Sequence, residues 1–290
     1  MKLIPLSRFI GAASAGALLV LGVPALSAQT AEELNASGIV KRDGGNLAGA
    51  VDDFTAAIAL KPNYIQLYAN RAVAETGQGS YDGAINDYTE VIKAKPNQAN
   101  GYLLRGLVNF IKGDLDKAGR DYIKAVELDP KDPTIYLYRG LFFDLNNDQG
   151  NAVLDYAKAI DLTAGGDSET ANYAQLYRAL DLRRRGRGTD EGLANWTKWK
   201  NKWTRTLAAY LGGKLADADL IGRAGSDVTD YKSQNREKAE AYYFIGRTHL
   251  IAGDTAGAKR NFAASVELQF PADVGRKLAQ AELDRMPSVQ

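Results

Sequence analysis

The chain has 290 residues, of which 45% are apolar, 24% charged and 9% aromatic, a composition typical of an ordinary soluble globular protein. Its 36 basic and 35 acidic residues leave a formal charge of +1, so no overall field would recruit nucleic acid or an anionic membrane surface. With no cysteine and one histidine, His249, the sequence excludes thiol catalysis, disulfides, thiolate or multi-histidine metal sites and a cysteine-linked lipid.

The N-terminal 28 residues are typical of an export signal. Two basic residues precede an uncharged stretch rich in Ala, Gly and Leu, and small residues follow it where a signal peptidase needs them. We expect cleavage after Ala28, with Ala25-Leu26-Ser27 as the alternative frame, and a periplasmic or secreted mature chain. An uncleaved anchor is the competing interpretation, because roughly 23 uncharged residues could cross a bilayer.

A period of 34 residues follows. Each of four successive units carries a small residue, an alanine twelve positions later and an aromatic residue four positions beyond that alanine. Apolar residues at three- and four-residue spacing predict two helices per unit, and the small residues let these helices approach closely. A glycine or asparagine suited to a left-handed turn lies between the helices, at Gly45, Gly79, Gly113 and Asn147. The aromatics, expected to fill the space between neighbouring pairs, are Phe54, Tyr88, Tyr122 and Tyr156.

This pattern resembles the tetratricopeptide repeat over residues 31–166. The resemblance implies an all-α superhelical solenoid of helix-turn-helix units. A further unit is predicted at 237–270, where His249 takes the place of a packing tyrosine and is therefore expected to be structural. Residues 167–236 break the period and predict an irregular helical insert, and residues 271–290 predict a capping helix and tail.

Arginine and aspartate also recur at fixed positions of the units. The arginines are Arg71, Arg105 and Arg139, and the aspartates are Asp53, Asp87, Asp121 and Asp155. Every arginine has one aspartate before it and one after it at a fixed separation. This arrangement favours structural ion pairs that join adjacent units over a row of catalytic carboxylates.

The insert contains all three tryptophans, Trp196, Trp199 and Trp203, interleaved with basic residues. Spacings of three and four place the rings on one face of a predicted helix. This face is either a surface that stacks on a partner or a cell-wall polymer, or a core stripe that packs the insert onto the solenoid. The arginine run at 183–187 is likewise either a polymer-binding or partner-binding surface or a helix end that favours cations.

Two acidic pairs in the insert define the enzyme alternative. Asp190 with Glu191, or Asp217 with Asp219, could be proposed as the acid and base of a cryptic carboxylate hydrolase. Their spacing does not distinguish them from ordinary surface charge. We therefore predict that the protein is not an enzyme and has no catalytic residue, no cofactor and no metal site.

The resemblance to the repeat implies that the first helix of each unit lines a concave face. In the third and fourth units the residues at these positions are unusually apolar for an open surface: Leu103, Leu107, Phe110, Leu137 and Leu141. We predict a groove that accepts an apolar helix or extended segment of another protein rather than a charged C-terminus. The alternative is that the chain's own insert, as a Trp196–Trp203 helix, fills the groove.

Three features resemble the NlpI-type envelope tetratricopeptide adaptors of Gram-negative bacteria: the YxxRG units, the tryptophan segment ending at 210–214, and the late YYFIGRTHLIAGD repeat. The resemblance implies a non-catalytic, often dimeric scaffold in the periplasm that brings peptidoglycan hydrolases together with a protease that degrades them. Those relatives are lipoproteins, whereas this chain has no cysteine to carry a lipid anchor. The expected partners are other envelope proteins, a second copy of the chain included. Direct binding of a cell-wall polymer through the Trp- and Arg-rich insert is the alternative function.

Overall fold

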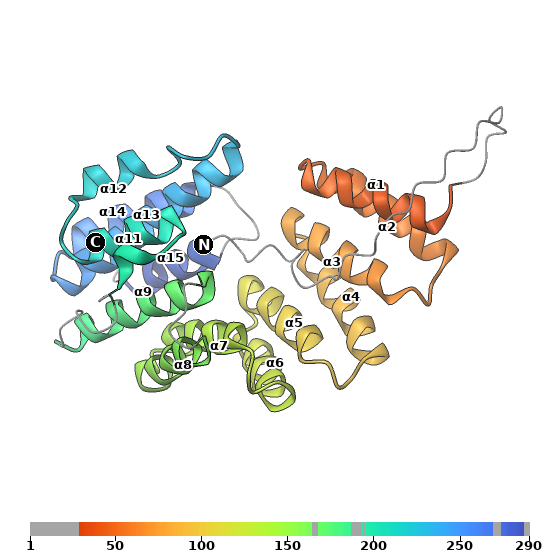
Figure 1. Cartoon of the computed structure of the whole chain (residues 1–290), viewed down its shortest axis with the longest axis horizontal. Coiled ribbons are helices and arrows are strands. Elements are labelled where there is room, and N and C mark those ends of the chain that lie inside the picture. Colours follow the sequence, from red (N-terminus) through yellow and green to blue (C-terminus); the bar gives the residue numbers. More distant parts are fainter. Residues whose placement is uncertain (1–28, 164–167, 187–192, 194, 269–273, 287–290) are drawn as a thin grey trace.

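The computed structural model describes residues 29–163, 168–186, 193, 195–268 and 274–286. The predicted signal segment lies outside them. Within the described residues every regular element is a helix, and the helices follow one another as packed pairs (Figure 1). The all-α solenoid predicted from the 34-residue period is therefore confirmed.

Four helix pairs occupy the region of the four predicted repeats. Between the two helices of each pair the backbone turns through a left-handed residue, with φ of 84° at Gly45 and Gly79, 104° at Gly113 and 61° at Asn147. The pairs are α1 (Ala31–Asp43) with α2 (Leu47–Leu60), α3 (Ile65–Gln78) with α4 (Tyr81–Ala94), α5 (Ala99–Lys112) with α6 (Leu115–Leu128), and α7 (Pro133–Leu145) with α8 (Gln149–Leu162).

The small residues of the repeat lie against the aromatic ring of the second helix in the same unit. A Cβ atom added at Gly140 would lie only 2.6 Å from the ring of Tyr156, and one added at Gly106 would lie 3.0 Å from the ring of Tyr122. Both tyrosines are fully buried, so neither ring has free space into which it could move. The helices of a pair can approach closely because these side chains are absent.

Replacing Gly106 by leucine should therefore destabilise the protein by roughly 1–3 kcal/mol, because the added side chain overpacks the interface with Tyr122. Urea unfolding followed by circular dichroism measures the loss. Gly222→Leu is the matched control, since Gly222 is exposed in a helix and has no atom within 4 Å of the Cβ position. Equal stability of the two variants would contradict the packing described for Gly106.

The arginine and aspartate ladders form ion pairs, but not between the units that the sequence suggested. Each arginine binds the aspartate 16 residues later, in the second helix of its own unit, through two parallel hydrogen bonds of 2.7–3.0 Å. The preceding unit is reached through a threonine instead: Arg71 Nη1 donates to Thr55 Oγ1, and Arg105 Nη1 donates to Thr89 Oγ1, both at 3.1 Å. Each arginine side chain reaches the aspartate of its own unit because the second helix of that unit lies directly beside the first.

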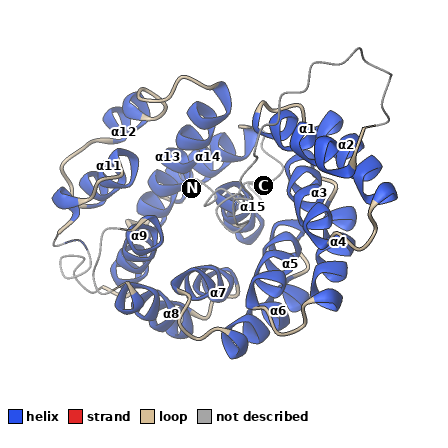
Figure 2. Cartoon of the chain, turned by 45° about the vertical axis from the view of Figure 1, so that its right-hand side comes forward, coloured by secondary structure: helices blue, strands red, loops and turns tan. Residues whose placement is uncertain are grey.

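The chain then continues round the same curve. The helix α9 (Glu169–Arg184) packs on α8. It is followed by a short 3-10 turn, η2 (Trp196–Lys198), and by α11 (Lys202–Leu211) and α12 (Asp217–Arg223). A last pair, α13 (Tyr231–Ile251) and α14 (Thr255–Glu267), precedes α15 (Val274–Arg285). Figure 2 shows the helices arranged as a ring with α15 inside it. The last helix packs on α13 and α14, and it lies inside the ring rather than only at the end of the stack.

Candidate functional site: the inner face of the ring

The predicted groove residues of the third and fourth repeats are buried inside the protein. Leu103, Leu107, Phe110, Leu137 and Leu141 are each at most 3% exposed. They belong to one continuous apolar cluster that also contains residues of α13 and the residues Val274, Leu278 and Ala279 of α15. The expectation of an open groove at these two repeats is therefore wrong, because helices from the end of the sequence cover them.

The tryptophans do not form the helical stripe that the sequence suggested. Trp196 begins the short turn η2, Trp199 has an extended backbone with ψ of 133°, and Trp203 lies in the first turn of α11. The break arises at Asn201, whose side chain accepts a hydrogen bond from the Thr204 amide at 3.0 Å and so starts a new helix.

The tryptophan rings pack into the core and do not form a stacking surface. Trp199 and Trp203 are 4% and 8% exposed, and Trp196 packs against the same cluster while partly buried. Trp203 Nε1 donates a hydrogen bond of 2.5 Å to Glu240 on α13. The contacts of α11 run to α9 and α13, so no Trp196–Trp203 helix occupies the groove.

A buried cluster of charges joins the two sides of the ring. The guanidinium of Arg247, on α13, lies 2.8 Å from Asp144 of α7, 3.3 Å from Asp181 of α9 and 3.3 Å from Glu282 of α15. Its Nη1 also donates to the hydroxyl of Tyr243 at 2.8 Å. All five side chains are buried. One arginine therefore links four helices that are far apart in the sequence.

This cluster has fewer positive charges than negative ones. Three carboxyl groups face the guanidinium of Arg247, and within the ranges that the structure describes only Glu282 has a second ion-pair partner, Arg285 at 3.7 Å. Among the described residues Asp144 Oδ1 and Asp181 Oδ2 have no hydrogen-bond partner. Burial and the neighbouring charge of Asp144 raise the pKa of Asp181 well above the usual range of an aspartate. Repulsion among the carboxyl groups of the cluster is consequently lowest when Asp181 is protonated.

Arg247 is the central residue of this buried cluster, and the repeat pattern did not single it out. If Gly246 is aligned with Gly106 and Gly140, Arg247 occupies the same repeat position as Leu107 and Leu141. The register could therefore have placed it on the inner face. The fact that its partners would be Asp144, Asp181 and Glu282 could not be inferred from a period of 34.

The inner face of the first two repeats is less deeply buried. Asn35 and Ile39 of α1, and Ala69 and Val73 of α3, occupy the positions equivalent to the buried leucines and are half-buried, as is Gln66 one turn before Asn70. Amide groups connect the two helices here: Asn70 Nδ2 donates to Asn35 Oδ1 at 2.7 Å, and Gln66 Nε2 donates to Asn70 Oδ1 at 3.4 Å. This part of the inner face therefore combines apolar atoms with amides beside solvent.

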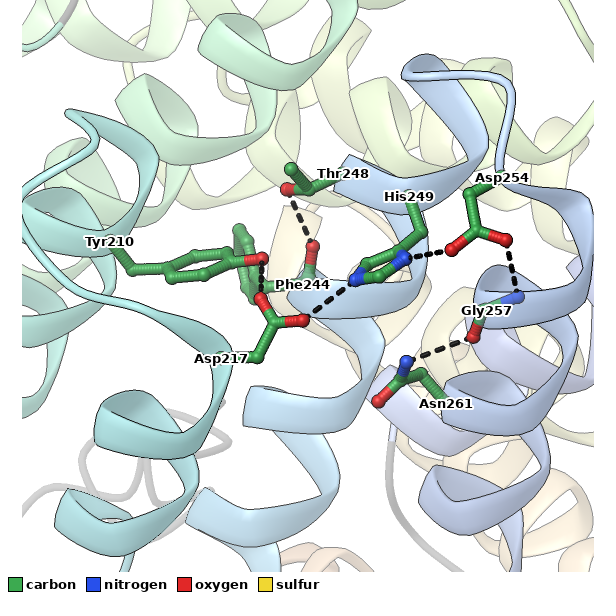
Figure 3. Close-up of polar contacts among 8 residues, drawn as sticks. All are labelled: Tyr210, Asp217, Phe244, Thr248, His249, Asp254, Gly257 and Asn261. Carbon is green, nitrogen blue, oxygen red and sulfur yellow. Dashed lines mark hydrogen bonds and ion pairs between the residues drawn. The ribbon is translucent and has the colours of Figure 1, made fainter.

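A second polar cluster surrounds the single histidine (Figure 3). Nε2 of His249 lies 2.7 Å from Asp217 at the start of α12, and Nδ1 lies 2.6 Å from Asp254, which precedes α14. Tyr210 of α11 donates to the other oxygen of Asp217 at 2.8 Å. The hydrogen bonds to Asp217 and Asp254 raise the pKa of His249. The half-buried histidine thus connects the insert with the last repeat.

Because this pKa is raised in the folded state, the His249 contacts stabilise the protein fully below the unfolded pKa near 6.5, and the contribution disappears as pH rises through the folded pKa. His249→Gln should lose roughly 0.5–1 kcal/mol at pH 6, because the carboxylates are partly exposed and screened, and less at pH 9. Urea unfolding at both pH values tests this. A loss that grows with pH would contradict the role assigned to His249.

The acidic pairs of the enzyme alternative have structural partners or lie outside the described residues. Asp217 binds His249 and Tyr210, and Asp219 accepts a hydrogen bond from the Ala216 amide at the start of α12. Asp190 and Glu191 lie outside the described residues. Arg183 donates to the carbonyl of Leu211, and the arginine run ends α9. Its last member, Arg187, is also outside them.

One cavity of about 250 Å³ opens between α9, α11 and the segment that follows α12. Its walls carry charges of both signs, and Lys202 and Asp227 form an ion pair of 2.5 Å beside it. In the described part of the chain no group of three or more His, Asp or Glu side chains could hold a metal ion. Among the helices described, none has the length and apolar character needed to cross a membrane.

Comparisons with known proteins agree with this architecture. A family model described as tetratricopeptide repeat matches residues 35–99 and 70–133. The structure of a tetratricopeptide repeat protein from Parabacteroides merdae is 19% identical, with 87% of this chain and 98% of that chain covered and a TM-score of 0.54. MamA from Desulfovibrio magneticus RS-1 is 26% identical over 48% of this chain and 78% of that chain, with a TM-score of 0.45.

PilF from Pseudomonas aeruginosa is 14% identical over 87% of this chain and 97% of that chain, with a TM-score of 0.49. No curated protein sequence matches the chain.

Proposed function

We propose that the chain is a non-catalytic scaffold that binds other proteins on the inner face of α1 and α3, because residues 35–133 match a family model described as tetratricopeptide repeat. The observation that carries this proposal is a difference in burial between inner-face residues at equivalent positions of the repeats. The inner-face residues of the third and fourth repeats are covered by the chain's own helices, whereas those of the first two repeats are half-buried. The remaining accessible inner face is therefore that of the first two repeats.

The chemistry of this surface suits a peptide segment. Ile39 and Val73 offer apolar contacts, while the amides of Asn35 and Gln66 can bind the polar backbone of an extended chain. The bidentate pair of Arg71 and Asp87 holds α3 against α4, and the hydrogen bond from Asn70 to Asn35 joins α3 to α1, so the surface is preformed. A preformed surface loses less conformational entropy when a partner binds.

Gln66→Arg tests this surface, because a long cation placed beside Asn35 and Asn70 should block it. Gln78→Arg is the matched control: it is the same substitution in the same helix, at an exposed position at its far end. Tagged proteins are recovered from the native organism and the captured proteins are identified by mass spectrometry. We expect Gln66→Arg to lose partners that Gln78→Arg retains, with similar melting temperatures. Equal capture by both variants would refute the proposed surface.

We further propose that the mature chain acts in the periplasm and that its partners are other envelope proteins, including peptidoglycan hydrolases and a protease. The support is the signal-like segment 1–28 and the resemblance to NlpI-type adaptors. In fractionated cells we expect a chain beginning near Gln29 in the periplasmic fraction. A membrane-bound chain with residues 1–28 intact would overturn this proposal. Direct binding of a cell-wall polymer by the tryptophans is not proposed, because the rings of Trp199 and Trp203 are buried.

A further inference from the structure

We infer that α15 is a displaceable ligand of the inner face, and that the surface beneath it binds an amphipathic helix of a partner with the same pattern of side chains. The pattern is an apolar residue, two more apolar residues four and five positions later, and a carboxylate eight positions later, as at Val274, Leu278, Ala279 and Glu282. The inference rests on the proposed scaffold function but concerns a different part of the inner face.

The apolar side of α15 packs on α13 and α14, inside the ring. Val274, Leu278 and Ala279 are at most 2% exposed, and they belong to the same apolar cluster as Leu103 and Leu107. Figure 2 shows this helix inside the ring formed by the other helices. The chain thus supplies its own amphipathic helix to the interior of the ring, in the way that a groove binds the helix of another protein.

The charged contact of α15 can be given up without leaving a buried arginine unpaired. Glu282 is 3.3 Å from Arg247, whereas Asp144 and the hydroxyl of Tyr243 are each 2.8 Å away. Arg247 therefore keeps its two nearest partners when α15 leaves, and the remaining carboxylates are no longer crowded by a third. Most buried ion pairs resist separation because one charge would be stranded, but this one does not strand the arginine.

Several other polar contacts of α15 lie at its edges. Arg276 Nε donates to the carbonyl of Val266 at 3.2 Å, and Gln280 donates to Asp284 within the same helix. The amino group of Lys277 lies near Gly113, at the end of α5. None of these contacts is deeply buried. An incoming helix would need to replace the three buried apolar side chains, the carboxylate and the partly buried Ala281, Leu283 and Met286, which pack against the same cluster.

These contacts define what the partner must carry. A helix with a basic residue at the position of Glu282 would place a second cation against Arg247 and should be rejected. A helix with an aspartate in place of Leu278 would bury a charge among leucines and should also be rejected. The preferred partner is consequently an amphipathic helix with one acidic residue beyond its apolar pair.

The test uses the whole protein and a fluorescein-labelled synthetic peptide of residues 274–286. Leu278→Asp in the protein should undock its own α15, and Asp284→Ala, at an exposed position of the same helix, is the matched control. By fluorescence anisotropy we expect the Leu278→Asp protein to bind the peptide at least tenfold more tightly than wild type or Asp284→Ala. Peptides with Leu278→Asp or Glu282→Lys should lose binding. Equal affinity of all three proteins would overturn the inference.

Hydrogen exchange of the wild-type protein provides a second measurement in case Leu278→Asp fails to fold. Amides of α15 should exchange at least tenfold faster than those of the inner helix α7, because α15 detaches while the ring remains folded. Equal rates would show that α15 is a fixed part of the core. Light scattering of the peptide-binding variant must show a monomer, since a dimer formed by exchanged α15 helices would make a second copy the occupant. None of these measurements depends on Gln66. The proposed binding surface of α1 and α3 is therefore tested independently of the inference about α15.

Discussion

Replacing Leu107 and Leu141 together by aspartate is expected to unfold the protein. Both side chains are at most 3% exposed and lie in the cluster that joins α5, α7, α13 and α15. Each substitution removes a buried leucine, which costs about 2–5 kcal/mol, and adds a carboxyl group that has no partner in an apolar core. The sum is comparable to the entire stability of a typical domain, about 5–15 kcal/mol.

Circular dichroism and tryptophan fluorescence measure this loss. We expect no cooperative melting transition, and an emission shifted towards that of exposed indole because Trp199 and Trp203 share the cluster. Ile123→Asp with Leu154→Asp is the matched control, since these two apolar residues, on the second helices α6 and α8, are 51% and 66% exposed. A melting temperature that moves little in the Leu107 and Leu141 variant would show instead that these residues line an open groove.

Removing the guanidinium of Arg247 is expected to have the second-largest effect. Arg247→Met leaves Asp144, Asp181 and Glu282 without their common partner in a buried site. Breaking a buried ion pair from one side typically costs about 3–5 kcal/mol, because a charge is left uncompensated. The triple variant with Asp144→Asn and Asp181→Asn should recover part of this loss, because it removes two of the uncompensated charges.

The pH dependence of the Arg247→Met loss has a definite sign. A carboxyl group whose pKa is raised in the folded state stabilises the fold at low pH and loses that contribution as the pH rises through the folded value. Burial already raises the pKa of Asp181 with the arginine present. Urea unfolding should therefore show a smaller loss at pH 5.5 than at pH 8. A loss below about 1 kcal/mol at both values would contradict the arrangement of the cluster.

The fold could be predicted from the sequence because the residues that determine the structure of each repeat lie within that repeat. The small residues at positions such as Gly106, the buried tyrosines that face them and the left-handed Gly79 and Asn147 are local features of a 34-residue unit. The aspartate partner of each arginine was harder to predict, since one aspartate lies 16 residues after Arg71 and another lies 18 residues before it. Spacing alone does not tell which helix lies alongside.

The candidate site depended on contacts that no local pattern contains. Whether Leu107 and Leu141 face solvent is decided by α13 and α15, which begin at least 90 residues later. The tryptophan spacing suggested one helix because a cap such as Asn201 changes helical phase without altering composition. Arg247 alone could have been found earlier, by carrying the repeat register into the last unit.

The buried bridge between Arg247 and Asp144 spans 103 residues of sequence, and this has a consequence for how the protein folds. In an open solenoid each repeat contacts only its neighbours, so the stack can form or fray one repeat at a time. Here a single large apolar cluster runs from Leu103 to Ala279, whereas smaller separate clusters serve the first repeats. Apart from α15, the second half of the ring should therefore form late and as one cooperative unit, since a long loop must close first. The first two repeats can open and close independently of it.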